Sequence, residues 1–111
     1  LTSLDSPLRT VIPQDFTPPP PLLNLVAVPT AKGVELRWDP SPAPDLAGYR
    51  VYRRRAGEAQ AVRLTPQLLK KPYFVDPQAV RGRTYYYTVT AVDDSQRANE
   101  SLPSEELMVV F

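Results

Sequence analysis

Proline is the residue that most limits how this chain can fold, with fourteen copies among 111 residues against four glycines. A proline inside a helix bends or breaks it, because proline lacks a backbone N–H and its ring clashes with the preceding turn. Turns, strand ends and edge strands accept proline more readily. One stretch with some helical character, residues 64–71, is limited by Pro66 and Pro72. We therefore expect an all-β fold.

Short segments of alternating apolar and polar residues lie between these turn-forming residues. Val34, Leu36 and Trp38 alternate with polar residues, which is the period-two pattern of a strand with one face on a core. The first predicted strand is closed by Pro29. Regularly spaced strands of this kind predict a seven-stranded antiparallel β-sandwich rather than alternating strands and helices. The seven predicted strands cover residues 22–28, 33–39, 49–55, 61–64, 72–76, 84–92 and 105–111.

Residues 1–21 show no such alternation and include the run Pro18-Pro19-Pro20-Pro21. Consecutive prolines favour an extended polyproline II conformation. We interpret residues 1–21 as a proline-rich tail or semi-rigid linker that precedes a domain over residues 22–111. The alternative is that apolar residues of this segment dock onto the sandwich and extend it, namely Leu8, Val11, Ile12 and Phe16.

The composition excludes several kinds of site. The chain has no cysteine and no histidine, so it lacks thiolate chemistry, disulfides and the commonest zinc ligand and proton-transfer group. A net charge of +1 is too small for a general nucleic-acid-binding domain. No apolar run reaches the roughly 18 residues that span a bilayer. We expect no cofactor, no nucleic-acid partner and no transmembrane segment.

Acidic pairs are the remaining candidates for chemistry. Asp93-Asp94 and Glu105-Glu106 have the residue type of a glycosidase pair, but neighbours on a strand point to opposite faces. Asp93, Asp94, Asn99 and Glu100 carry oxygen ligands that suit calcium, although the glycine-bearing spacing of a calcium loop is missing. The sequence therefore predicts a non-catalytic domain without a metal site.

Several motifs in order along the chain resemble a known family. They are Trp38 on the second predicted strand, residues 44–52 (PDLAGYRVY), residues 84–93 (TYYYTVTAVD) and the link at residues 99–104. Together they resemble a fibronectin type III domain, an immunoglobulin-like sandwich, and the resemblance covers about residues 22–111. It is closest to copies in exported bacterial proteins, including multimodular enzymes and surface lipoproteins.

The resemblance implies roles for individual core residues. Tyr85 matches the family's tyrosine corner, whose hydroxyl bonds to the backbone a few residues upstream, here near Ala79 or Val80. Trp38 is expected to fill the centre between the two sheets. The predicted structural core consists of Trp38, Tyr49, Val51, Tyr85, Tyr87 and Val89.

The outer face of the sheet that holds the third, sixth and seventh strands is the candidate partner surface. If the core residues point inward, alternation turns Tyr52, Tyr86, Thr88 and Thr90 outward, beside a run of arginines over 53–55. Exposed tyrosine, methionine and arginine are enriched at protein interfaces. The alternatives are ordinary cross-strand tyrosine packing and a solvated arginine edge that discourages aggregation. The candidate surface residues are Tyr52, Tyr86, Arg50, Arg54 and Met108, with Arg53, Arg55 and Arg63 in the same positive cluster.

Two functions fit these expectations. The first is a non-catalytic interaction or spacer module of an exported bacterial protein, located outside the cell or in the cell envelope. Its partners would be proteins or neighbouring domains, it would be a monomer, and a lipid anchor on a missing N-terminal segment is one expectation for it. The alternative is a carbohydrate-binding accessory module of a secreted polysaccharide-active enzyme, with a glycan partner held by coplanar, exposed Tyr52 and Tyr86.

Overall fold

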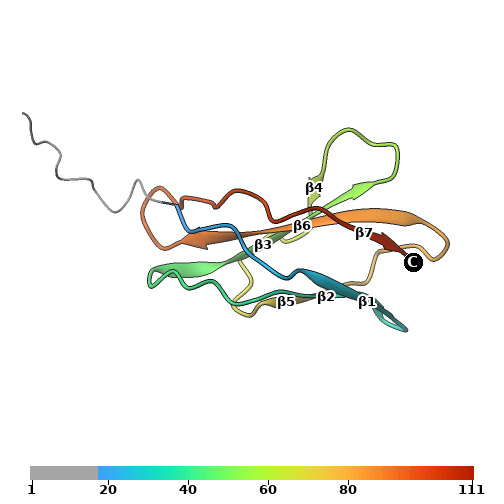
Figure 1. Cartoon of the computed structure of the whole chain (residues 1–111), viewed down its shortest axis with the longest axis horizontal. Helices are drawn as coiled ribbons and strands as arrows, with labels where there is room; N and C mark the ends of the chain where they lie inside the picture. Colours follow the sequence, from blue (N-terminus) through green and yellow to red (C-terminus); the bar gives the residue numbers. More distant parts are fainter. Residues whose placement is uncertain (1–17) are drawn as a thin grey trace, which may run out of the picture.

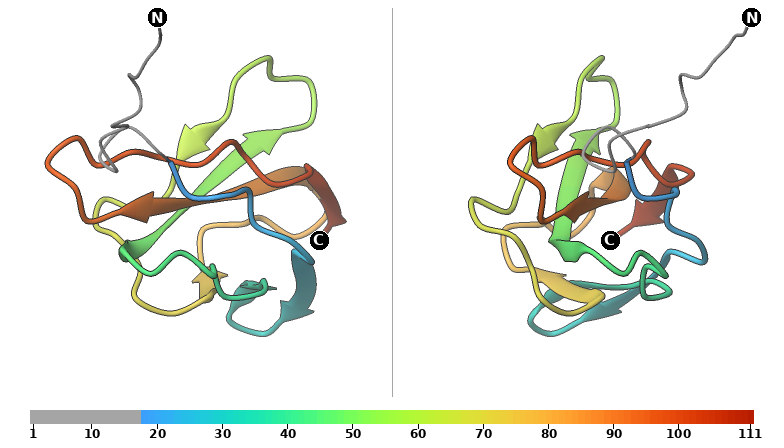
Figure 2. Two further views of the ribbon diagram at one scale, coloured as in Figure 1. Left: turned by 60° about the vertical axis from the view of Figure 1, so that its left-hand side comes forward. Right: turned by 90° about the vertical axis from the view of Figure 1, so that its left-hand side faces the viewer.

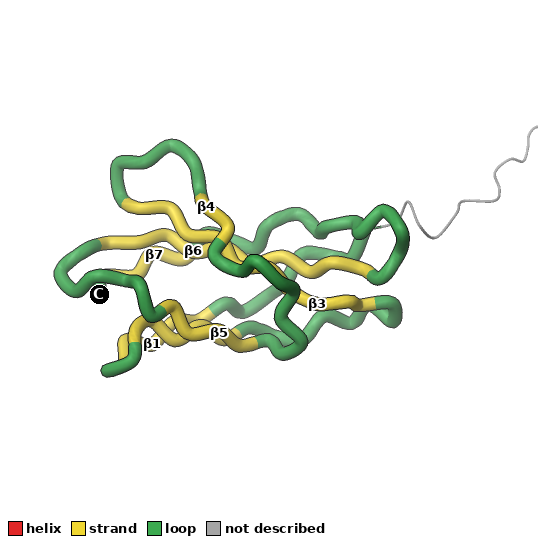
Figure 3. Tube along the Cα trace, turned by 180° about the vertical axis from the view of Figure 1, so that it is seen from behind, coloured by secondary structure: helices red, strands yellow, loops and turns green. Residues whose placement is uncertain are grey.

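The computed structural model describes residues 18–111, and these residues contain seven strands and no helix (Figure 3). The predicted docking residues Leu8, Val11, Ile12 and Phe16 lie outside the described part of the chain. The strands are β1 (Val26–Thr30), β2 (Gly33–Arg37), β3 (Leu46–Arg55), β4 (Val62–Arg63), β5 (Tyr73–Asp76), β6 (Thr84–Asp93) and β7 (Leu107–Val110).

Two antiparallel sheets pack face to face (Figure 1). One sheet has the order β1-β2-β5 and the other has the order β4-β3-β6-β7. The longest pairing joins the two ten-residue strands β3 and β6, with Val51 opposite Val89. Two further views show the same two layers (Figure 2). The predicted seven-stranded antiparallel sandwich is therefore confirmed.

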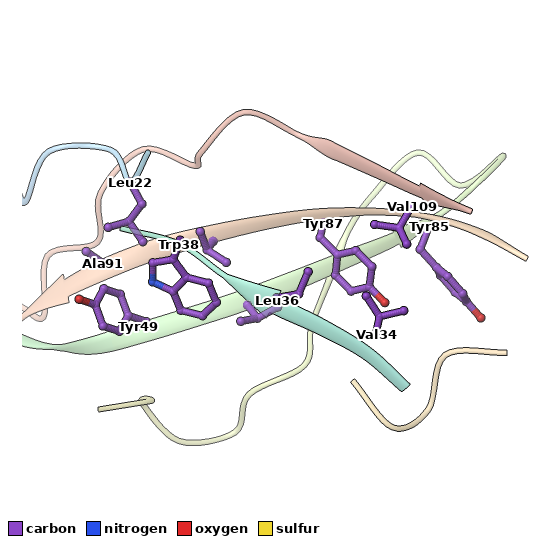
Figure 4. Close-up of a cluster of buried hydrophobic side chains, with 11 residues drawn as sticks. Leu22, Val34, Leu36, Trp38, Tyr49, Tyr85, Tyr87, Ala91 and Val109 are labelled. Carbon is purple, nitrogen blue, oxygen red and sulfur yellow. The ribbon is translucent and has the colours of Figure 1, made fainter. Parts of the chain in front are cut away.

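The core lies between the sheets and receives alternate side chains from both (Figure 4). The Trp38 ring meets the Tyr49 ring edge to face, with centroids 5.5 Å apart, a favourable aromatic geometry. Trp38 stands just beyond the end of β2. All six predicted core residues are buried, and with them lie Leu22, Val34, Leu36, Ala91 and Val109.

The tyrosine corner is present at the start of β6. The backbone N–H of Val80 donates a hydrogen bond of 2.8 Å to the Tyr85 hydroxyl, at one of the two residues expected. A buried tyrosine ring thus fixes the turn that leads into β6, one of the two longest strands.

The first strand differs from the prediction. β1 begins at Val26 rather than Leu22, and it continues through Pro29 to Thr30 instead of ending at the proline. Asn24 has a positive φ of 60° and interrupts the strand before Val26. Pro29 is tolerated because β1 is an edge strand, where one side of the backbone needs no donor.

Residues 99–104 form an element that strand alternation did not predict, and we name it the serine strap. It runs back beside β6 before β7 begins (Figure 1). Ser101 donates its N–H to the carbonyl of Ala91 at 2.8 Å and accepts the Ala91 N–H on its hydroxyl at 3.0 Å. Ser104 makes the same two kinds of bond with Val89. Serine hydroxyls therefore replace the backbone carbonyls of a regular ladder.

Candidate functional site

The candidate partner surface lies on the outer face of the sheet β4-β3-β6-β7. Strand alternation places Tyr52 and Tyr86 there, in register with Thr88 and Arg54 respectively. Both tyrosines are half-buried rather than fully exposed, whereas Met108 on β7 is 57% exposed. Neighbouring charged side chains cover the tyrosines and divide this face into two clusters.

The first is the Glu100 cluster, made by Glu100, Tyr52, Thr90 and Arg50. The hydroxyls of Tyr52 and Thr90 both donate to Glu100 Oε2, at 2.5 and 2.6 Å. Arg50 donates to Glu100 Oε1 at 3.1 Å and forms an ion pair with it. Glu100 belongs to the serine strap, so its side chain reaches across β6 to β3. Thr90, which we predicted to face solvent, is buried because this carboxylate covers it.

The Glu100 cluster shifts the acidity of its members. Burial alone raises the pKa of the Glu100 carboxyl, but hydrogen bonds from Thr90 and Tyr52 and the charge of Arg50 outweigh burial and lower it. Burial, followed by the hydrogen bond to Glu100, raises the pKa of the Tyr52 hydroxyl. The carboxylate is thus held ionised and the phenol neutral.

The second is the Arg54 cluster, made by Arg54, Glu106, Tyr86 and Met108. The Arg54 guanidinium donates to both carboxylate oxygens of Glu106, at 2.9 and 3.1 Å. It also lies 4.3 Å from the centroid of the Tyr86 ring, which is cation–π geometry. The hydrogen bond from Arg54 lowers the pKa of the Glu106 carboxyl. Met108 stands opposite Tyr86 on β7.

The predicted positive cluster is wrong as a single surface, because alternation along β3 divides its arginines between two faces. Arg53 turns to the core side, pairs with the buried Asp76 at 2.8 Å and lies over the ring of Tyr85. Arg50 and Arg54 are neutralised by Glu100 and Glu106. Of the predicted cluster, Arg55 and Arg63 remain exposed.

A shallow hollow lies beside the Glu100 cluster, and we name it the outer hollow. Its volume is about 290 Å³. Tyr52 contributes from β3, Thr88 and Thr90 from β6, and the serine strap closes one side. Its lining residues are Tyr52, Ala61, Thr88, Thr90, Glu100, Ser101 and Pro103.

The acidic residues weighed for calcium do not come together as ligands. Asp93 already accepts hydrogen bonds from the backbone N–H groups of Ser95 and Asn99 and from both of their side chains. The Asp93 carboxylate therefore organises the turn after β6. Across residues 18–111 no group of acidic side chains is arranged to hold a metal ion.

Within the same residues, no helix is long and apolar enough to cross a membrane.

Comparison with solved structures identifies the fold. An Fn3-like protein from Clostridium thermocellum is 25% identical with a TM-score of 0.67, over 83% of this chain and 92% of that one. The chicken CNTN1 FN1–FN3 domains are 14% identical with a TM-score of 0.71, over 84% of this chain and 31% of that one. The titin domains A168–A170 are 15% identical with a TM-score of 0.70, over 84% and 32%.

The protein is thus an immunoglobulin-like β-sandwich. Within that class its fold is that of a fibronectin type III domain, because its sheet order, tyrosine corner and structural neighbours agree. No family model matches the chain.

Two curated relatives are much longer proteins, and this chain matches a short segment of each. An amylopullulanase of Thermoanaerobacter thermohydrosulfuricus is 32% identical over 96 residues, which is 83% of this chain and 6% of that protein. An amylopullulanase of Thermoanaerobacterium saccharolyticum is 31% identical over 105 residues, 90% of this chain and 8% of that protein. The chain spans less than a tenth of the length of these relatives. Fibronectin type III modules are non-catalytic parts of larger proteins, so this module is not the enzyme.

Proposed function

We propose that this module is a non-catalytic accessory and spacer domain of an exported bacterial enzyme that acts on polysaccharides. The observation that carries the proposal is the match of 83% and 90% of the chain to segments of two amylopullulanases. In such an enzyme the module holds neighbouring domains apart and contacts them through its surface.

The path of the chain supports a spacing role. The start of the described segment and the C-terminus lie toward opposite ends of the long axis of the sandwich (Figure 1). Pro19 is buried, and Pro18, Pro19 and Pro20 line a hollow with residues 43–45 and Asp94. We propose that docking of these prolines onto the domain fixes the direction in which the chain enters it.

The Arg54 cluster supports contact with a neighbouring domain. Tyr86 and Met108 present aromatic and thioether surface next to a guanidinium, and these three residue types are enriched at interfaces. We propose that this part of the outer face meets the adjoining protein. An extracellular location follows from the proposed role on polysaccharides, and a lipid anchor stays a prediction.

The test compares two replacements in the polypeptide that carries the module. Replacing residues 22–111 by a glycine-serine linker is expected to lower hydrolysis of pullulan while leaving hydrolysis of a short soluble oligosaccharide unchanged. An Fn3 domain from chicken CNTN1 in the same place is the control, and it is expected to restore much of the loss because it supplies spacing alone.

Two results would contradict the proposal. One is unchanged pullulan hydrolysis with the glycine-serine linker. The other is hydrolysis of pullulan by residues 18–111 expressed alone, because a spacer has no catalytic activity of its own.

A further inference from the structure

We infer that the outer hollow is a binding subsite for one ring of a neutral polysaccharide, with an α-glucan as its ligand. The inference rests on the proposed function for the class of polymer, and on the side chains of the hollow for the site. At about 290 Å³ the hollow is just below the roughly 300–1,000 Å³ common for small-molecule pockets. It therefore has room for one sugar ring of a longer chain.

The lining combines an aromatic ring with several hydrogen-bonding groups. Tyr52 supplies apolar ring surface with a polar end, and Thr88 supplies a hydroxyl from the neighbouring strand β6. A sugar ring has apolar C–H groups on its faces and hydroxyls around its rim, so it needs both kinds of contact. Thr88 makes no side-chain hydrogen bond within residues 18–111, and its hydroxyl is left to serve a ligand.

The carboxylate of the hollow is held in place before any ligand arrives. Glu100 Oε2 accepts two hydroxyls, while Oε1 accepts one bond from Arg50 and keeps capacity for another. Side chains already fixed by such bonds lose less conformational freedom on binding. The Glu100 cluster thus offers an ordered acceptor to a sugar hydroxyl.

The charge balance of the hollow favours a neutral ligand over an anionic one. The lining itself contains no cation, and the neighbouring Arg50 is paired with Glu100, so the lining offers no positive charge to a phosphate or an acidic peptide. An anion would meet the Glu100 carboxylate directly. A polyhydroxylated neutral chain meets no such repulsion.

Affinity electrophoresis of the whole chain in gels containing pullulan tests the inference. Retardation is expected for the wild type, and Thr88→Val is expected to weaken it about fivefold, as loss of one hydrogen bond does. Tyr52→Ala is expected to abolish it. Thermal melts establish that each variant is folded, and Thr88→Val decides the matter where Tyr52→Ala fails to fold.

The chain offers matched controls for both changes. Thr84→Val removes a hydroxyl from the same face of β6, outside the hollow. Tyr73→Ala removes a tyrosine from the opposite sheet. The Tyr73 hydroxyl, like that of Tyr52, donates to a glutamate, here Glu35 at 2.8 Å. Both controls are expected to migrate like the wild type.

Three outcomes would overturn the subsite. They are free migration of the wild type in pullulan, equal retardation of wild type and Thr88→Val, and retardation by anionic polygalacturonate without retardation by pullulan. If the subsite fails while the linker replacement still lowers pullulan hydrolysis, the proposed function stands without it. If the subsite is found while that replacement has no effect, the spacer role fails alone.

Discussion

Arg53 and Arg54 are neighbours in the chain, yet the sandwich places them in two different environments. Arg53 points between the sheets, where its side chain is 12% exposed and pairs with an Asp76 side chain that is 2% exposed. Arg54 points outward and pairs with Glu106, whose side chain is 43% exposed. The two ion pairs have nearly equal lengths, 2.8 and 2.9 Å.

The difference shows that burial, rather than distance, decides what an ion pair contributes. Breaking a buried pair leaves an uncompensated charge in a poorly solvated place, whereas water replaces an exposed partner at little cost. Asp76 also accepts the hydroxyl of Tyr87 at 2.7 Å and the backbone N–H of Gln78 at 3.1 Å, so removing this one carboxylate leaves three donors without a partner. The predictions below test this contrast, from the largest expected effect to the smallest.

Asp76→Ala is expected to lower the free energy of unfolding by about 3–5 kcal/mol, as for other broken buried pairs. Urea denaturation of the wild type and the variant measures the change. Combining it with Arg53→Leu and Tyr87→Phe removes the two stranded side-chain donors and is expected to recover most of the loss. A loss below about 1 kcal/mol for Asp76→Ala would end the contrast between the two pairs.

Tyr85→Phe separates packing from hydrogen bonding on the buried side. The phenylalanine ring still lies under Arg53, but the backbone N–H of Val80 loses its acceptor. The expected loss of unfolding free energy is about 1 kcal/mol, measured by urea denaturation. Tyr86→Phe on the outer face is the control and is expected to change stability less; an equal loss in both would argue against a special corner.

Glu100→Gln tests an ion pair of intermediate burial through its pH dependence. The folded protein lowers the pKa of this carboxyl, so its contribution is present above the unfolded value of about 4.3 and is lost as the pH falls through the folded value. Wild type is expected to be more stable than Glu100→Gln near neutral pH, with the gap closing in acid. Urea denaturation over a series of pH values checks this, and a gap independent of pH would contradict it.

Arg54→Met is expected to have the smallest effect on stability. The exposed pair with Glu106 is screened by salt, and methionine keeps apolar contact with the Tyr86 ring. Melting temperatures of wild type and variant are expected to agree within error at high salt. A large decrease in melting temperature that persists at high salt would show that the Arg54 pair contributes to stability as the buried Arg53 pair does.

Much of the fold could be predicted because alternation and large aromatics are local signals. Trp38, Tyr85 and Tyr87 are buried where the period-two pattern placed them, and the Tyr85 hydroxyl finds the backbone at Val80. The same pattern also implied that Arg53 lies opposite in direction to Arg54. The prediction treated the arginines as one cluster because their shared charge was weighed above their alternation.

The remaining features depend on contacts between distant segments. Glu100 was weighed as a calcium ligand and as part of the link at residues 99–104, and no local pattern indicates that it reaches Tyr52 and Arg50 about fifty residues away. Pro29 was taken as a strand end because sequence alone does not reveal that β1 is an edge. The outer hollow depends on the serine strap, whose sequence is like that of an ordinary loop. Only the structure shows that its serines bond to Ala91 and Val89.

The serine strap also determines which backbone groups at the edge of the larger sheet are open to pairing with another polypeptide. Along this side of β6 the first half is taken by β7 and the second half by hydroxyls and amides of residues 99–104, with Pro103 among them. A foreign strand that paired with this edge would meet the short strand β7 and then residues 99–104, which Pro103 interrupts. It would not meet a long row of unpaired backbone amides and carbonyls. The connection between β6 and β7 therefore itself limits the addition of a foreign strand at this edge.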